Sequence, residues 1–358
     1  MTALDFAEIH DQLRSVASEL LGSVPAADAV DWGLLAEAGW LGLEVPEALD
    51  GAGATFAEVA VILDEMGRAT TRSAYLGSVV LGVAALHVAQ PGAGRDDLLR
   101  SIGSGAAVVV PALSGDATVG AADLPFVVDR SGGSARVRGA ASFVVDAPVA
   151  DHLLLPAVDG DDPVLVAVEA GTPSLAVEDR PVLDETRRFG AVVADGVAIA
   201  DDAVLPVAGD PVRCLAGLRD RAAVAVACDS LGVSEAMLAA TVAYASVRQQ
   251  FGRPIGSFQA VKHACADMLV SVSVARELVS AAVAAVAGDE DAAVPASMAK
   301  AYACDTAVAV AGSAMQLHGG IGYTWESGIH VHLKRAALNR SLFGSPVEHR
   351  RRLAARYR

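Results

Sequence analysis

The strongest constraint on the fold is that the residue pattern changes twice along the chain. From about residue 107 to 207, short apolar runs alternate with clusters of Gly, Pro and Asp, which is typical of strands and turns. On both sides of this region, apolar residues recur at helical spacing. So many short strands in one region predict an antiparallel barrel or sandwich. The predicted strands are Ala107–Val110, Phe126–Asp129, Ala135–Arg138, Ser142–Val145, Leu153–Leu155, Val164–Val168 and Gly190–Ile199.

The flanking regions carry clear helix signals. Thr55 and Glu58 fit a capping box, in which the hydroxyl caps one amide and the carboxylate reaches back to another. An α+β, multidomain protein is therefore predicted. We place an N-terminal helical domain at residues 1–106, a central β domain at 107–208 and a C-terminal helical domain at 209–358.

Composition excludes several classes of function. The net charge is −16, from 43 acidic and 27 basic residues, and such a surface repels nucleic-acid backbones. No uninterrupted apolar run reaches the roughly 18 residues of a membrane helix, so no membrane partner is expected. The four cysteines form no C-x-x-C pair, and the start of the chain does not resemble a signal peptide. We therefore expect reduced thiols and a cytoplasmic protein.

Two C-terminal segments are more specific. The first, Arg248–Met268, reads RQQFGRPIGSFQAVKHACADM, and the second, Gln316–Glu326, reads QLHGGIGYTWE. An arginine suits phosphate oxygens because its planar guanidinium donates two parallel hydrogen bonds. Paired glycines let a backbone approach a ligand closely and expose its amides. The alternatives are a surface salt bridge for Arg248 and a plain turn between helices for the glycines.

Together these segments resemble the acyl-CoA dehydrogenase family, and Leu35–Pro46, Asp50–Gly53 and Glu65–Arg68 resemble it too. The resemblance implies a helical domain, a β domain and a four-helix bundle, assembled into tetramers. It also implies a flavoenzyme that binds FAD and an acyl-CoA thioester and passes electrons to an electron-transferring flavoprotein. In the family, both segments reach the flavin of a neighbouring subunit. The FAD contacts carried over to this chain are Arg248, Phe251, Gln259, Gln316, Gly319 and Gly320.

The sequence departs from the family where the catalytic base is expected. Many members carry a Glu in a Tyr-Glu-Gly-Thr stretch, and the matching residues here are Leu342–Ser345, with Phe343 in place of the Glu. Other members carry the base ten residues before the Gly of a Leu-Gly pair, which corresponds to Ala222 here, counted from Gly232. The flavin-facing stretches of the β domain are also altered, and match Leu113–Thr118 and Phe143–Asp146.

Asp229 is the remaining candidate for a general base. It lies on the small apolar stripe of the helix predicted over 215–247, two turns after Ala222. A carboxylate on a buried face has a raised pKa unless it is paired, which suits a base that works near neutral pH. The alternative is that Asp229 bonds a neighbouring helix or an arginine of a partner subunit. Asp220 and Glu235 lie off the stripe and are expected to be solvated.

Other charged groups offer weaker sites. His330 and His332 are two residues apart and point to different faces of a helix, so no metal site is predicted. The basic residues near the C-terminus are interpreted as a solvated last helix, with an acidic partner surface as the alternative. They are Lys334, Arg335, Arg340, Arg350, Arg351 and Arg352.

Several functions remain open. The first is an acyl-CoA dehydrogenase chain that forms a homotetramer and desaturates an acyl-CoA between its α and β carbons. The second is a subunit that completes a flavin site while a homologous partner chain supplies the base. The resemblance favours this second reading, because actinobacterial relatives that act on steroid side-chain thioesters are built from two unlike chains. A non-catalytic scaffold subunit and a flavin monooxygenase on the same fold are the further alternatives.

Overall fold

The computed structural model describes residues 3–24, 28–116, 124–131, 134–288, 291–324 and 327–356. The chain divides into two compact units. The first comprises Met1–Ala29, Ala60–Arg72 and Ala223–Arg358, and the second comprises Val30–Val59 and Ser73–Ala222. Two helices, α3 (Phe56–Arg68) and α6 (Pro211–Val247), contribute residues to both units.

The second unit is built around an eight-stranded sheet. The strand order is β6-β7-β3-β2-β4-β5-β8, with β1 paired to β4. Most pairs are antiparallel, as predicted, but β1 and β2 both run parallel to β4. The sheet is therefore mixed. The strands are β1 (Val109–Pro111), β2 (Phe126–Asp129), β3 (Arg136–Val145), β4 (His152–Asp159), β5 (Asp162–Glu169), β6 (Leu175–Asp179), β7 (Phe189–Ala198) and β8 (Val204–Pro206).

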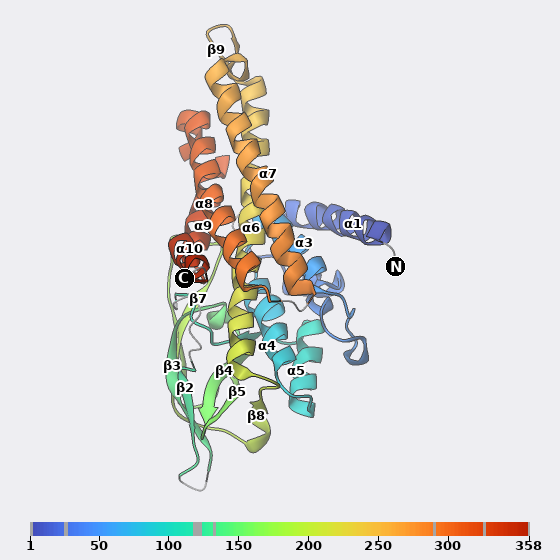
Figure 1. Ribbon diagram of the computed structural model, residues 1–358, viewed down its shortest axis with the longest axis vertical. Helices are drawn as coiled ribbons and strands as arrows, with labels where there is room; N and C mark the ends of the chain where they lie inside the picture. Colours follow the sequence, from blue (N-terminus) through green and yellow to red (C-terminus); the bar gives the residue numbers. More distant parts are fainter. Residues whose placement is uncertain are drawn as a thin grey trace. The chain divides into compact units, whose positions relative to one another are not determined.

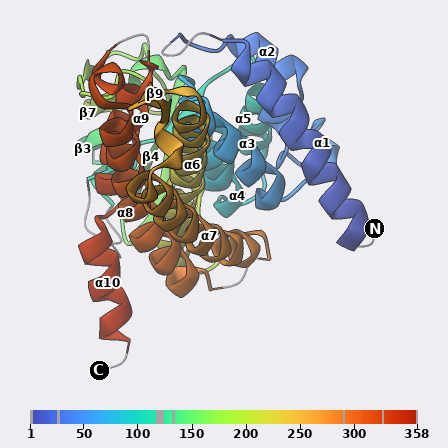
Figure 2. The same ribbon diagram turned by 90° about the horizontal axis from the view of Figure 1, so that it is seen from above.

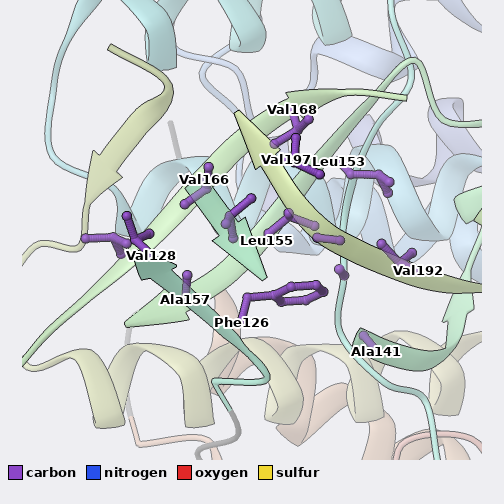
Figure 3. Packing of buried hydrophobic residues seen from close by; sticks show 14 of the residues in the cluster. Phe126, Val128, Ala141, Leu153, Leu155, Ala157, Val166, Val168, Val192 and Val197 are labelled. Atoms are coloured by element: carbon purple, nitrogen blue, oxygen red, sulfur yellow. The ribbon is translucent and has the colours of Figure 1, made fainter. Parts of the chain in front are cut away.

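One face of this sheet forms the main apolar core of the second unit. Alternate residues of each strand point inward, and the ring of Phe126 lies among branched aliphatic side chains (Figure 3). Phe126, Leu155 and Val166 are fully buried. The helical elements of this unit are α2 (Trp32–Glu37), η1 (Trp40–Gly42), η2 (Glu47–Leu49), η3 (Leu76–Gly82), α4 (Val83–Val88), α5 (Ala93–Gly103), η4 (Ala147–Val149) and η5 (Asp201–Ala203).

The first unit is a bundle of long helices, and its part after residue 223 is drawn from yellow to red in Figure 1. Its elements, besides parts of α3 and α6, are α1 (Ala3–Gly22), β9 (Gln249–Gln250), β10 (Arg253–Pro254), η6 (Ile255–Ser257), α7 (Gln259–Ala287), α8 (Ala293–His318), η7 (Gly319–Tyr323), α9 (Ile329–Ser341) and α10 (Pro346–Ala355). Small residues let these helices pack closely. A Cβ on Gly67 would lie 2.1 Å from the Asp229 carbonyl oxygen, and one on Gly232 would lie 1.9 Å from that of Asp64. The backbones of α3 and α6 therefore touch at this crossing.

The order of helices, strands and helices agrees with the expected fold class. The predicted boundaries at residues 106 and 208 fall in the connections between α5 and β1 and between β8 and α6. The compact units, in contrast, divide α3 and α6. Two predicted strands, at 135–138 and 142–145, form the single strand β3, whose pairing with β7 is shifted between Ala141 and Val144.

Two of the described helices are long and apolar enough to cross a membrane by length and composition alone. In α6 the apolar window is 83% buried, whereas in α7 it is only 28% buried. Counting uninterrupted apolar runs did not predict these windows. The evidence for a membrane is weak, because core helices of soluble proteins pass the same test.

Candidate functional site

The first predicted motif forms a hairpin between α6 and α7. Helix α6 ends at Val247, and β9 then pairs with β10 in an antiparallel register. Phe251 and Gly252 form the turn with φ of 52° and 76°, the left-handed conformation that tight hairpins require. The Phe251 side chain is 91% exposed. Arg248 and Gln259 are also exposed, at the two ends of the hairpin segment. Figure 1 shows the hairpin, labelled β9, at the tip of α6 and α7.

The second predicted motif ends helix α8. Gly319 has a φ of 61°, which favours glycine and stops the helix. A Cβ at Gly319 or Gly320 would meet no atom within 4 Å, so both glycines face open space. Gln316 is exposed one turn earlier. The last residues of this motif, Trp325 and Glu326, lie outside the described residues.

An aromatic contact brings the two motifs together. The ring of Tyr244, in the last turn of α6, stacks on that of His318, at the end of α8, with centroids 4.4 Å apart. The motifs therefore lie at the same end of the helical bundle. Figure 2 looks down on this end, with the hairpin labelled β9 in front of α6. All six residues that are predicted to contact FAD lie in these two motifs, and all six are exposed.

The charge of this end differs from that of the chain as a whole. Residues 236–266 contain no Asp or Glu, although the chain carries a net charge of −16. Within this stretch, the Arg253 guanidinium lies over the Phe258 ring, 4.2 Å from its centroid. Within the described part of the chain, by contrast, the Arg248 guanidinium has no hydrogen-bond or ion-pair partner. An exposed arginine and unobstructed glycines suit the phosphates of a dinucleotide.

Neither family position for the catalytic base holds a proton acceptor. Phe343 is 5% exposed with a φ of 54°, and its carbonyl oxygen accepts a hydrogen bond of 3.0 Å from His349 Nε2. The next carbonyl oxygen, of Gly344, accepts one of 2.8 Å from Lys300 Nζ. The segment therefore ties α8 to α10 through buried contacts. Ala222, the other position, is fully buried.

Burial changes the titration of the two basic groups in this contact. It lowers the pKa of Lys300, and it lowers the pKa of His349 to about 4 although the bond to Phe343 acts in the opposite direction. His349 Nε2 faces a carbonyl oxygen, which cannot donate, so this nitrogen carries the proton. The side chain is therefore a neutral structural histidine at neutral pH.

Asp229 lies where the apolar stripe predicted, and it is 1% exposed. Its carboxylate accepts hydrogen bonds of 3.0 and 2.7 Å from Arg335 Nε and Nη2, and one of 2.6 Å from Asn339. Arg335 is itself 2% exposed and also donates to the Thr71 carbonyl oxygen. This bidentate pair joins α6 to α9. The geometry supports the structural alternative for Asp229, and its role as a base stays a prediction.

The expectation that Asp220 and Glu235 are solvated is wrong. They are 6% and 8% exposed. Glu235 pairs with Arg68 of α3 and Arg276 of α7, so neighbouring helices neutralise its charge. Periodicity missed this cluster because its charged residues come from different helices, which only the folded chain brings together. The Glu65–Arg68 segment was the available signal, but it was assigned only to the family resemblance.

The same cluster contains an acid with an altered pKa. Burial raises the pKa of Asp64 to about 6, against the lowering effect of Arg68. Its Oδ2 lies 3.8 Å from Arg14, which is too long for a hydrogen bond. Burial likewise raises the pKa of Glu65.

In the altered stretch Phe143–Asp146 of the β domain, side chains make contacts within the chain. The Phe143 ring stacks on that of Phe189 with centroids 4.2 Å apart. Asp146 is 1% exposed, and its Oδ2 accepts a 2.9 Å hydrogen bond from the Gly77 amide. Of the other stretch, Ala117 and Thr118 lie outside the described residues.

The weaker candidates also have structural partners. His332 bonds the carbonyl oxygens of Arg68 and Gly328 at 3.0 and 3.2 Å. Arg340 and Arg350 both pair with Asp305, at 2.7 and 2.6 Å. Of the six basic residues expected on a solvated helix, Arg335 is buried instead. Within the described ranges, no three His, Cys, Asp or Glu side chains come close enough to hold a metal ion.

Comparison with known proteins accounts for this architecture. The acyl-CoA dehydrogenase N-terminal domain matches residues 5–98, and the C-terminal domain of the same family matches residues 219–357. The chain belongs to the acyl-CoA dehydrogenase family. Its members are oxidoreductases that act on the CH–CH bond of acyl-CoA, and the family indicates a flavin cofactor. The recognition from sequence is thereby confirmed.

Individual family members are similar over nearly the whole chain. Acyl-CoA dehydrogenase IpdE2 of Mycolicibacterium smegmatis is 32% identical over 326 residues, which cover 90% of this chain and 86% of that protein. A chain of the Tcur3481-Tcur3483 steroid acyl-CoA dehydrogenase is 28% identical, with a TM-score of 0.85 and coverage of 98% and 97%. The ChsE4-ChsE5 complex from Mycobacterium tuberculosis contains a chain that is 25% identical, with a TM-score of 0.87 and coverage of 97% and 96%.

Proposed function

We propose that this chain is one subunit of a hetero-oligomeric, FAD-dependent acyl-CoA dehydrogenase that degrades lipid or steroid-derived thioesters. In this proposal a homologous partner chain holds the dinucleotide and supplies the base. Support comes from two similar structures that are named as pairs of chains, one described as a complex and one as a steroid acyl-CoA dehydrogenase.

One observation carries the proposal. The six residues expected to contact FAD are exposed at one end of the bundle, whereas both base positions hold apolar, buried side chains. A chain that keeps its ligand-contacting residues on the outside is suited to a ligand held by another subunit. A chain without a proton acceptor at either position needs one from elsewhere.

The residues fit the dinucleotide in the following way. The Arg248 guanidinium would hold phosphate oxygens through two N–H groups, and the amides of Gln259 and Gln316 would donate or accept further hydrogen bonds. The Gly319 amide already donates to the Gln316 carbonyl oxygen, so what Gly319 and Gly320 would offer this ligand is close approach of the backbone, because a Cβ at either would meet no atom within 4 Å. When bound, the flavin supplies the acceptor for the hydride from the thioester β-carbon, and an electron-transferring flavoprotein then takes up the electrons.

The α-proton must leave to a base, and this chain offers none at the family positions. Phe343 and Ala222 carry no ionisable group. The Asp229 carboxylate accepts three hydrogen bonds from Arg335 and Asn339, and these bonds fix its position inside the bundle. We therefore assign proton abstraction to the partner chain.

The surface of α7 supports an assembled state. Leu269, Val270 and Val274 are 54%, 64% and 41% exposed on one helix. Exposed apolar residues that cluster in this way mark interaction surfaces. An interface here would bury the apolar window of α7.

The test is flavin retention in the co-expressed assembly. Arg248→Ala should lower the FAD affinity at least tenfold, since a charge-assisted bond contributes about 1.5–3 kcal/mol. Arg253→Ala is the matched control, because Arg253 lies on the same hairpin but stacks on Phe258. If Arg248→Ala retains FAD as well as Arg253→Ala does, the proposed phosphate contact is wrong.

A further inference from the structure

A stacked pair of rings, Tyr244 of α6 and His318 of α8, connects the two helices. The Tyr244 and His318 rings lie 4.4 Å apart with an interplanar angle of 22°. The Tyr244 hydroxyl also donates a long, 3.4 Å hydrogen bond to the His318 carbonyl oxygen. His318 is 8% exposed, and Tyr244 is half-buried. The contact is therefore held mainly by stacking.

Each ring is joined directly to one flavin-contacting motif. The Tyr244 carbonyl oxygen accepts the Arg248 amide at 2.9 Å, so Tyr244 is one helical turn from the predicted phosphate contact. His318 immediately precedes Gly319, where α8 ends and the glycine turn begins. A Cβ on Gly322 would lie 2.9 Å from the Met315 carbonyl oxygen, so this turn folds back against α8.

The orientation of the histidine ring is also set. His318 Nδ1 lies 2.7 Å from the Ala314 carbonyl oxygen. A carbonyl oxygen only accepts, so Nδ1 carries the proton and the ring is held in one tautomer. With its edge held by its own helix, the ring presents its face to Tyr244.

We infer that Tyr244 and His318 are positioning residues, which fix the Arg248 hairpin and the Gly319 turn in a single register for one FAD molecule. The inference rests on the proposed function. Stacking of this kind contributes roughly a three- to tenfold effect on an equilibrium.

The test compares variants that keep a ring with variants that remove it, in the assembly co-expressed with its partner. Tyr244→Phe and His318→Phe should keep FAD affinity within about twofold, because the stack remains. Tyr244→Leu and His318→Leu should each weaken it about three- to tenfold and raise the fluorescence of released flavin. The double leucine variant should be little worse than either single one, because both remove the same contact.

Two controls separate positioning from general destabilisation. Tyr302→Leu removes a half-buried aromatic residue from α8 far from the motif and should leave FAD affinity unchanged. His318→Asn keeps an amide donor for Ala314 but removes the ring, so it should behave as His318→Leu does while remaining folded. Leucine variants with the FAD affinity of Tyr302→Leu would overturn the inference. An unmodified assembly that binds no FAD would instead refute the proposed function.

Discussion

Two charged residues, one within α6 and one just after its end, lie in opposite environments. Asp229 is 1% exposed, and Arg335 and Asn339 occupy its carboxylate. Arg248, just after the helix ends, is exposed and has no side-chain partner within the described ranges. The difference shows how to separate structural from functional polar groups in this chain. A buried polar group whose bonds are made inside the chain holds the fold, whereas an unpartnered one among open glycines is available to a ligand.

The largest effect on stability is expected for the buried residue of this pair, Asp229. Asp229→Ala should lower the free energy of unfolding by about 3–5 kcal/mol, because it leaves the Arg335 charge buried without a counter-ion. Chemical denaturation of the purified chain measures this difference.

Asp229→Asn separates the structural role from the catalytic one. As a structural residue, it should lose stability and activity together. If Asp229→Asn abolishes acyl-CoA oxidation by the assembly but leaves the denaturation midpoint unchanged, Asp229 is the base and the structural assignment is wrong.

The next effect concerns pH and the contact at Phe343. The ordinary pKa of a histidine is 6.5, and burial lowers that of His349 to about 4. The unfolded chain therefore binds a proton more readily than the folded one between these values. The contribution of His349 to stability is complete above pH 6.5, decreases as the pH falls, and is lost near pH 4, a change of about 3 kcal/mol.

His349→Gln is the matched variant, since its amide can donate to Phe343 and accept from Ser297 without titrating. The difference between the unfolding free energies of the two proteins should therefore depend on pH between 4 and 6.5. A difference that stays constant across this range would contradict the buried, neutral histidine. Asp64, whose pKa is raised to about 6, acts in the opposite direction but equally in both proteins.

A smaller effect is expected for the exposed apolar residues of α7, which we propose lie in the interface with the partner chain. Leu269→Asp should weaken assembly by about 1.5–3 kcal/mol, the contribution of a buried leucine, without changing the fold of the isolated chain. Sedimentation of the co-expressed complex measures this. Val127→Asp is the control, because Val127 is similarly exposed, at 55%, on strand β2. Equal dissociation by both variants would show that α7 is not the interface.

The smallest effect is expected for the surface ion pairs of the C-terminal helices. Asp305 binds Arg340 and Arg350, both of which are half exposed. Asp305→Asn should change the free energy of unfolding by no more than about 1 kcal/mol. A loss as large as that of Asp229→Ala would show that exposure does not separate the two kinds of site.

Local patterns predicted much of this fold. The capping box at Thr55 and Glu58 forms, with the Thr55 amide donating to the Glu58 carboxylate at 2.9 Å. Strand β6 was missed because its inward and outward faces are both partly exposed. The parallel pairing of β1 and β2 with β4 joins segments that are distant in sequence, so no local pattern reveals it.

For the candidate site, too, local patterns predicted some residues and missed others. The positions expected to contact FAD could be named from the sequence because each motif is contiguous, and their contacts with FAD stay a prediction. The buried charge partners of Glu235 and Asp229 come from other helices, and only the folded chain brings them together. The Tyr244–His318 stack was missed because neither residue is unusual in its own segment.

The most direct test of this account is to purify the chain alone and with its homologous partner, and to measure bound FAD and acyl-CoA oxidation in both preparations. The account predicts a colourless, inactive chain alone and a yellow, active complex together. A homotetramer of this chain alone that is yellow and oxidises acyl-CoA would contradict it.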